Sequence, residues 1–336
     1  MTGGEQPAFL AFTEKGFALA QRLQAAMGGR VTRAGRGSEE PFSLQSWTAD
    51  AFAARRKIVF VGAVGIAVRA VAPHLRSKAT DPAVVAVDEL GRFAVPICSG
   101  HLGGANDLAR QVAGVCGAVP VITTATDCEN RFAVDEWARR QNCAVAQPWR
   151  IKDISARVLA GKTIAVRSAW PVRGTPPAYV RLGDAGADVV VDLYRGGEAE
   201  ALCLVPRVAV LGIGCRRDTP QETVEQAFRT FCEELGVWEQ AVCEAATIDW
   251  KMQEPGLLAF CRAHGWPVRF FSAEALERLE GEFTGSPFVK RTVGVDNVCE
   301  RSAALASGGA LIGKKYVFGG VTLAMAQKPY EMDWTW

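Results

Sequence analysis

Short apolar runs alternate with segments of helical spacing along most of the chain, and glycines mark many of the changes between them. Three such runs lie at 7–13, 57–62 and 207–213, and each precedes a segment with a helical pattern. Because strands that alternate with helices pair in parallel, this order predicts an α/β fold with largely parallel sheets. One antiparallel hairpin is expected, with its turn at Glu89–Arg92.

A chain of 336 residues exceeds what one hydrophobic core usually holds, so more than one domain is expected. The strand and helix signals are clear in the first and last thirds and weaken between them. We therefore predict an α/β sandwich-type domain at 1–138, a small linking domain at 139–206 and a second α/β sandwich-type domain at 207–336.

Two local predictions can be tested directly against a structure. The run VPVITTATD at 119–127 is expected to form a strand. In the last third, Thr219 is the predicted N-cap of a helix, with Pro220 at its first position and Glu222 completing a capping box.

Composition limits the kinds of partner. Hydrophobic residues make up 49% and charged residues 22%, which is typical of a soluble globular protein. The formal charge of +2 gives no overall attraction to nucleic acid or to a membrane surface. The longest apolar run, 58–68, is too short to cross a bilayer, and no signal peptide is evident, so a cytoplasmic protein is expected.

Arginine accounts for 28 of the 38 basic residues. Arginine suits bidentate binding of carboxylates and phosphates, but an excess of it also arises from genomic bias. Ten cysteines are present, no two of them in a C-x-x-C motif, and only three histidines accompany them. We expect free, buried thiols in a reducing compartment and no metal site.

The segment 55–80 holds six Lys or Arg residues and no acidic residue. Arg69, Arg76 and Lys78 interrupt an apolar stretch there, where an unpaired charge is expensive to bury. This pattern favours an anion site, and the alternative is a solvated helix face. Arg69 and Arg76 would share a face only if one helix continued past Pro73.

The sharper signal is the glycine-rich segment SGHLGGAND at 99–107. Its glycines permit close approach to a ligand, and the helix that follows would direct free N–H groups at an anion. It is neither a Walker loop nor a dinucleotide fingerprint, and the alternative is a turn that simply begins a helix. Cys98 beside His101 is a poor candidate nucleophile, because Cys98 ends an apolar strand. The candidate binding residues of this segment are Ser99, Gly100, Gly103, Gly104 and Asn106.

Longer phrases carry a family resemblance. VGAVGIAVRAVAPHLRSKATDPAVVAVDELGRFAVPICSGHLGGANDLA, with VITTATD and FAVDEWA, resembles the N-terminal domain of the cobalamin-biosynthesis CbiG family. VLGIGCRRDTP, VGVDNVCERSAALASGG and KKYVFGGVTLAMA resemble the C-terminal domain of that family. The resemblance covers nearly the whole chain and is weakest at 28–56 and in the middle region.

The resemblance implies a hydrolase of the anaerobic corrin pathway that opens the ring A δ-lactone of cobalt-precorrin-5A and releases acetaldehyde. Cobalt would arrive within the substrate, so no cofactor is expected to be bound by the protein itself. His101 is the candidate base for water attack, with N–H groups near Gly103 and Gly104 and the Asn106 amide holding the oxyanion. Candidates for the second proton transfer are His74, Asp107 and Glu300, and candidate carboxylate clamps are Arg69, Arg76, Lys78 and Arg92.

Two other classes of function compete with this hypothesis. A non-catalytic tetrapyrrole carrier would bind the macrocycle without releasing acetaldehyde. A nucleotide-dependent enzyme would use Gly62–Gly65 or Gly212–Gly214, although neither has a complete fingerprint. Hand-off of the product to other corrin-pathway enzymes and a homodimeric state are left open by the sequence.

Overall fold

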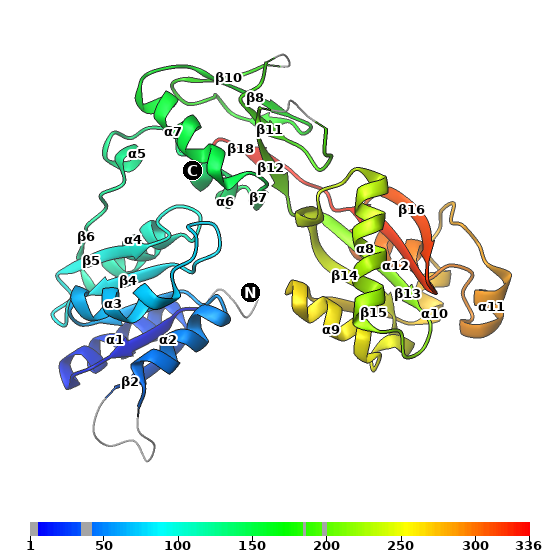
Figure 1. The fold of residues 1–336 in the computed structure, drawn as a ribbon, viewed down its shortest axis with the longest axis horizontal. Coiled ribbons are helices and arrows are strands. Elements are labelled where there is room, and N and C mark those ends of the chain that lie inside the picture. The colour runs from blue at the N-terminus through cyan, green and yellow to red at the C-terminus, as the bar shows by residue number, and fades with distance from the viewer. Residues whose placement is uncertain (1–5, 35–41, 184–185, 197–199) are drawn as a thin grey trace. The chain divides into compact units, whose positions relative to one another are not determined.

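The computed structural model describes residues 6–34, 42–183, 186–196 and 200–336 (Figure 1). The chain forms two compact units, each of which is described by itself. Unit 1 comprises residues up to Arg140, the segment 151–162 and Trp336. Unit 2 comprises 141–150 and 163–335. The predicted middle domain, 139–206, thus contributes to both units, and the three-domain division stays a prediction.

Unit 1 is built on a six-stranded sheet with the order β2-β1-β3-β4-β5-β6. Its strands are parallel except for the antiparallel β4–β5 pair, which confirms the predicted hairpin. The strands are β1 (Ala8–Ala11), β2 (Arg30–Arg33), β3 (Ile58–Val61), β4 (Val84–Val87), β5 (Phe93–Cys98) and β6 (Val119–Pro120).

Helices cover both faces of this sheet, which is why its central strands are apolar at every position. Phe9, Val59 and Val85 pack beneath α1 and α4 on one face, while Leu10 and Phe60 belong to the core under α2 and α3 on the other. The α-helices of unit 1 are α1 (Glu14–Met27), α2 (Leu44–Ala53), α3 (Val64–Val71), α4 (Ala105–Cys116), α5 (Ala125–Cys128), α6 (Val134–Arg140) and α7 (Ile151–Leu159), of which the first four pack on the sheet.

The predicted strand at 119–127 is mostly wrong. Only Val119 and Pro120 form a strand, and the short helix α5 begins at Ala125. Pro120 has no N–H to donate to a ladder, and Asp127 turns back to bond with residues of α4 and the loop before it. The conformation of 119–127 thus depends on side-chain interactions of Asp127, which the apolar pattern of the segment does not reveal.

Unit 2 contains two five-stranded sheets. The first has the order β10-β8-β11-β12-β7 and the second β15-β14-β13-β17-β16, and a two-stranded pair, β18-β9, is separate. The strands are β7 (Cys143–Val145), β8 (Ile164–Ser168), β9 (Val172–Arg173), β10 (Val180–Leu182), β11 (Val189–Val191), β12 (Leu202–Pro206), β13 (Ala209–Cys215), β14 (Val242–Ile248), β15 (Val268–Phe271), β16 (Leu311–Phe318), β17 (Val321–Gln327) and β18 (Met332–Asp333).

Helices lie on both faces of the second of these sheets. Phe228 of α8 and Phe260 of α9 pack on one face with Leu211, whereas Ala306 of α12 packs on the other with Val210. The first sheet joins the same core through Val205 and its neighbours. The helices are α8 (Gln221–Leu235), α9 (Pro255–His264), α10 (Ala273–Glu277), α11 (Pro287–Val293) and α12 (Cys299–Ser307).

Gly212 explains how closely α12 approaches the sheet. A Cβ atom at this position would lie 1.8 Å from the carbonyl oxygen of Cys299, at the start of α12. Any side chain there would force the helix away from β13. The G-I-G sequence is therefore accounted for by helix–strand packing.

The predicted capping box of α8 is wrong. The N-cap is Pro220, and no side chain caps the helix. The Thr219 hydroxyl instead donates to the carbonyl of Arg216 at 2.8 Å, which closes the turn before the helix. A local hydrogen bond across the turn thus replaces the cap that the sequence suggests.

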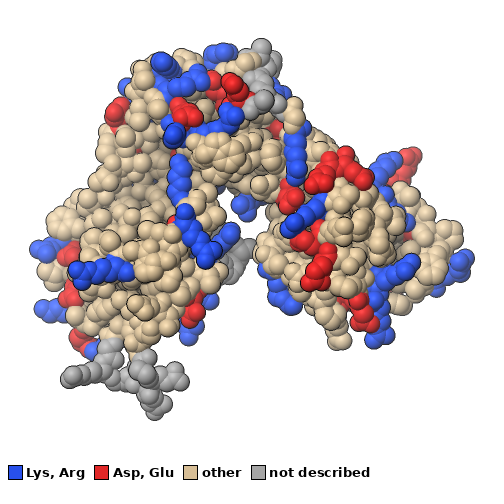
Figure 2. Space-filling view, viewed as in Figure 1, with Lys and Arg blue, Asp and Glu red and all other residues tan. Residues whose placement is uncertain are grey.

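All ten cysteines are free, as predicted, and five of them are buried. Cys128 is exposed, so the prediction of burial is wrong there. Basic and acidic side chains are interspersed over the visible surface (Figure 2), consistent with the near-zero net charge. Among the described helices, none combines the length and apolarity needed to cross a membrane.

Candidate functional site

A cavity of about 810 Å³ lies within unit 2, where β13 and β14 end. The carboxyl ends of parallel strands are the usual place for ligands in open α/β sheets. The walls come from the segments that follow β13 and β14, from α11 and the start of α12, and from β16 and β17. The lining residues are 214–218, 248, 250–251, 253–255, 288–289, 292–293, 297–299, 315, 317, 320 and 322.

Two helices begin at the cavity wall. Pro255 starts α9 and Cys299 starts α12, and these helices cover opposite faces of the sheet. The N-terminus of a helix carries a partial positive charge, because its first N–H groups have no partner within the helix. Both termini therefore favour a negatively charged group in the cavity.

The lining side chains combine positive charge with apolar surface. Arg216, Arg217, Lys251 and Lys315 are basic, against two acidic residues, Asp218 and Glu254. The aromatic and aliphatic side chains are unusually open, with Trp250 65%, Phe288 70% and Val317 64% exposed. Large exposed apolar side chains next to cations suit a ligand that has an apolar surface and also carries negative charge.

Glu254 and Lys251 form an ion pair at the wall of the cavity. The Lys251 Nζ donates to Glu254 Oε2 at 2.7 Å, and the two side chains are 15% and 6% exposed. The second carboxylate oxygen of Glu254, Oε1, is buried and has no hydrogen-bond partner among the described residues. Buried carboxylate oxygens normally accept a hydrogen bond, so this oxygen has capacity for one more donor.

Glu300, a predicted catalytic residue, lies behind this wall and is 1% exposed. Its Oε1 accepts from the Thr284 hydroxyl at 2.9 Å and from the Lys315 N–H at 2.7 Å. Its Oε2 accepts from the Thr284 N–H at 2.6 Å and from the Asn297 amide at 2.8 Å. Four hydrogen bonds occupy the carboxylate, so the arrangement supports a structural role that holds β16 and the loop before α12 together.

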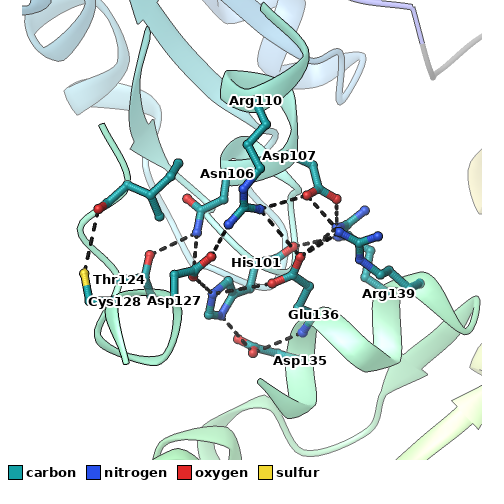
Figure 3. Close-up of polar contacts among 12 residues, drawn as sticks. His101, Asn106, Asp107, Arg110, Thr124, Asp127, Cys128, Asp135, Glu136 and Arg139 are labelled. Carbon is teal, nitrogen blue, oxygen red and sulfur yellow. Dashed lines mark hydrogen bonds and ion pairs between the residues drawn. The ribbon is translucent and has the colours of Figure 1, made fainter. Parts of the chain in front are cut away.

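In unit 1, His101 is at the centre of a buried polar network (Figure 3). Its Nδ1 lies 3.0 Å from Asp135 Oδ1 and its Nε2 lies 2.7 Å from Asp127 Oδ2. Burial lowers the pKa of His101, but hydrogen bonds and charge from Asp135 and Asp127 outweigh it and raise the pKa to about 9. The imidazole is therefore protonated at neutral pH, which disfavours the predicted role as a general base.

Three arginines complete the network, and two of them, Arg110 and Arg139, are labelled in Figure 3. Arg110 pairs with Asp127, and Arg139 and Arg140 both pair with Asp107. Burial raises the pKa of Asp107, but Arg139 and its neighbours outweigh it, so the pKa is lowered overall. The predicted proton-transfer role of Asp107 thus competes with its ion pairs.

Metal-ligand atoms of His101, Asp127 and Glu136 lie within 4.8 Å of one another, close enough to hold an ion. Here the Asp127 carboxylate is occupied by Arg110 and the imidazolium, and Arg140 Nη2 lies 3.1 Å from Glu136 Oε1. An ion would have to displace these cations. In this structure His101, Asp127 and Glu136 therefore form part of an ion-pair network with the arginines.

The glycine-rich segment 99–107 closes on itself. The N–H of Gly104 donates to the His101 carbonyl at 2.9 Å, and the N–H groups of Ala105 and Asn106 donate to Ser99 and Gly100 at 3.0 Å each. Gly104 has φ +81, which favours glycine, and Gly103 has no room for a side chain because its Cβ would lie 2.4 Å from Ser99 Cβ. These N–H groups are therefore not free for the predicted oxyanion hole.

The Asn106 amide is also occupied, although it was predicted to hold the oxyanion. Its Nδ2 donates to Thr124 Oγ1 at 3.0 Å and to Asp127 Oδ2 at 3.1 Å. The side chain is almost fully buried. Asn106 thus ties α4 to the segment around α5 rather than facing a ligand in this structure.

The basic residues that are predicted to bind substrate carboxylates lie at the surface. Arg69, Arg76 and Lys78 are exposed, so their charges need no buried partner. Arg69 and Arg76 share no helix face, because α3 ends at Val71 and a 3-10 turn follows. Arg92 is exposed and pairs with Asp88 at 3.2 Å. His74 lies against the Phe52 ring, with centroids 5.5 Å apart.

Apart from Gly214, which was named only for the nucleotide-dependent alternative, the residues of the large cavity were not predicted from the sequence. The signals that could have indicated them are G-I-G-C-R-R directly after a buried strand and Glu254 directly before a helix that begins with proline. Both place polar residues at the carboxyl end of a strand or the start of a helix. These two signals indicate a cavity only once β16, β17 and α11 are known to form the remaining walls.

The fold defines a two-unit α/β protein, and unit 2 contains a cavity lined by basic and apolar side chains. Comparison with known proteins specifies this further. Residues 46–127 match the family model described as "Cobalamin synthesis G N-terminal", and residues 209–326 match the one described as "Cobalamin synthesis G C-terminus". The chain belongs to this family, CbiG.

Three relatives illustrate the similarity. The cobalt-precorrin-5A hydrolase of Salmonella typhimurium is 33% identical, with 96% of this chain and 97% of that protein covered. The cobalt-precorrin-5A hydrolase of Priestia megaterium is 29% identical, with 96% and 95% covered. Protein CobE of a Sinorhizobium species is 31% identical, with 35% of this chain and 78% of that protein covered.

Proposed function

We propose that the protein is a cobalt-precorrin-5A hydrolase of cobalamin biosynthesis. The observation that carries this proposal is the similarity to two proteins of that name over nearly the full length of both partners. The reaction is the opening of the ring A δ-lactone with release of acetaldehyde, which leaves cobalt-precorrin-5B. The proposed reaction needs no cofactor of the protein's own, and the cobalt ion would belong to the substrate.

The cavity in unit 2 supports this substrate class. A cobalt-precorrin is a large conjugated macrocycle whose edge carries acetate and propionate groups. Trp250, Phe288 and Val317 offer apolar surface to the ring. Arg216 and Lys315 line the same cavity and can pair with carboxylates at the edge.

The chemistry requires water and two proton transfers. Water forms a bond to the lactone carbonyl carbon, and the bond from that carbon to the ring oxygen breaks and leaves a carboxylic acid and a hydroxyl. Loss of the hydroxyl proton then lets the oxygen form a carbonyl, while the neighbouring C–C bond breaks and its electrons enter the conjugated macrocycle. Acetaldehyde leaves, and no oxidant or reductant is needed.

The proposal predicts that the purified chain, supplied with cobalt-precorrin-5A under anaerobic conditions, releases one acetaldehyde per macrocycle. Trapping of the aldehyde and the mass of the product measure this. Tight binding of the macrocycle with no acetaldehyde would contradict the enzyme and favour the carrier alternative. If the protein neither binds the macrocycle nor releases acetaldehyde, both the enzyme and the carrier hypotheses are contradicted.

A second prediction tests the cavity as the binding site. Lys315→Met removes a cation from the wall, and we expect macrocycle binding to weaken by about 10-fold, the value of one charge-assisted hydrogen bond of about 1.5 kcal/mol. Lys314→Met is the matched control, because Lys314 is exposed and does not line the cavity. Quenching of tryptophan fluorescence by the macrocycle measures binding, and equal affinities of the two variants would reject this site.

A further inference from the structure

We propose that Glu254 is the base that activates water for lactone opening and that Lys251 positions it. This inference rests on the proposed function and on the cavity of unit 2 as its site. It assigns the proton transfer to a pair of residues in the segment between β14 and α9.

The free oxygen of Glu254 is the first support. The side chain is 6% exposed, yet Oε1 has no hydrogen-bond partner among the described residues, although Glu254 lines the cavity. Leaving a carboxylate oxygen buried without a donor costs free energy. Oε1 is closed to solvent in this structure, and a small turn of the side chain toward the cavity that Glu254 lines would bring this oxygen to a water molecule. That water would then be hydrogen-bonded to a proton acceptor beside the macrocycle.

The position of the carboxylate is the second support. Glu254 is the N-cap residue of α9, a ten-residue helix, but its side chain makes no cap hydrogen bond. The Lys251 ammonium holds the carboxylate instead, with Nζ donating to Oε2 at 2.7 Å. Because Lys251 occupies Oε2, Oε1 is the oxygen that remains to accept a proton.

Other candidates in or near the cavity lack one of these features. Asp218 is 81% exposed and lies 3.8 Å from Arg217. Glu300 already accepts four hydrogen bonds. Burial raises the pKa of the Cys299 thiol to about 12 and also raises that of Cys215, so neither is a ready thiolate nucleophile.

The step balances with water alone. Glu254 Oε1 accepts a proton from water as the water oxygen bonds to the lactone carbonyl carbon. The tetrahedral intermediate collapses, the bond to the ring oxygen breaks, and Glu254 returns its proton to that oxygen. The carboxylate is regenerated, and the product carries a new carboxylic acid and a free hydroxyl.

Glu254→Gln tests the inference in the full chain. Glutamine keeps the size and one carbonyl oxygen but cannot accept the proton, so we expect kcat for acetaldehyde release to fall about 100-fold or more while macrocycle affinity stays within about threefold. Glu222→Gln is the matched control, because Glu222 is an exposed acidic residue in the first turn of α8 and does not line the cavity. Its rate should equal that of the parent.

Lys251→Met tests the positioning role. Loss of the ammonium should lower kcat for acetaldehyde release while macrocycle affinity stays within about threefold, and Lys251→Arg, which keeps a charged donor, should recover most of the rate, a rescue that a merely structural residue would not show. If the glutamine variant does not fold, Glu254→Asp replaces it as the test. Aspartate keeps the charge but has a shorter side chain, so this variant should still bind the macrocycle and should release acetaldehyde more slowly.

The outcomes separate the two levels of the argument. A parent protein that releases no acetaldehyde contradicts the proposed function. A parent that is active, with Glu254→Gln or Glu254→Asp equally active, overturns the inference and leaves the proposed function intact. An unchanged kcat in Lys251→Met overturns the positioning role alone.

Discussion

Replacing Glu300 with leucine is expected to lower the free energy of unfolding of unit 2 by about 4 kcal/mol. The carboxylate is 1% exposed and accepts four hydrogen bonds from the backbone and side chain of Thr284, the Asn297 amide and the Lys315 N–H. Leucine fills the space but leaves these donors buried without an acceptor, and each such group loses the water it would otherwise bind.

Urea unfolding followed by circular dichroism measures this loss. Glu300→Gln is the matched control, since its amide oxygen can still accept from part of the set, and we expect it to be about half as damaging. A leucine variant as stable as the parent would contradict the structural role and would restore Glu300 as a candidate for chemistry.

The second large effect is a pH dependence of the stability of unit 1. The pKa of His101 is raised to about 9 in the folded protein, against about 6.5 in an unfolded chain. The folded state therefore holds the proton more tightly, and the contribution to stability is complete below pH 6.5. It is lost as the pH rises through 9, and it amounts to about 3 kcal/mol at most.

The comparison of the parent with His101→Gln isolates this contribution. The parent should lose stability between pH 6.5 and 9.5 by more than the variant, which has no titrating ring. Urea midpoints across this range are the measurement. Parallel curves for the two proteins would mean that Asp127 and Asp135 do not hold the imidazolium as the structure indicates.

Helix and hairpin predictions succeed where the pattern is local. The spacing of Leu19 and Leu23 defines one face of α1, and Gly28 ends that helix with φ +72. Pro255 and Gly265 mark the two ends of α9 in the same way. Such residues act on their own turn of backbone, so their effect can be predicted from a short stretch of sequence.

For the glycine-rich segment 99–107, only part of the prediction depends on local sequence. Part of the prediction for SGHLGGAND rests on glycines, and Gly103 and Gly104 are indeed required by backbone geometry. The structure does not support an anion site there, because the carbonyls of His101, Ser99 and Gly100 accept hydrogen bonds from the N–H groups at the start of the helix. Asp127 and Asp135, more than twenty residues further along the chain, decide the protonation of His101.

The alternation of apolar runs and helical segments by itself determined the fold class and the β4–β5 hairpin, and the long phrases that resemble the CbiG family indicated the family. The spacing of apolar residues shows which side of a helix or strand is buried, so the type of element can be predicted without knowing which distant residues pack against it. The cavity was decided only by the tertiary structure. Segments at 214–218, 250–255, 288–299 and 315–322 meet there, and the burial of Glu254 and the free oxygen it retains exist only once they have met.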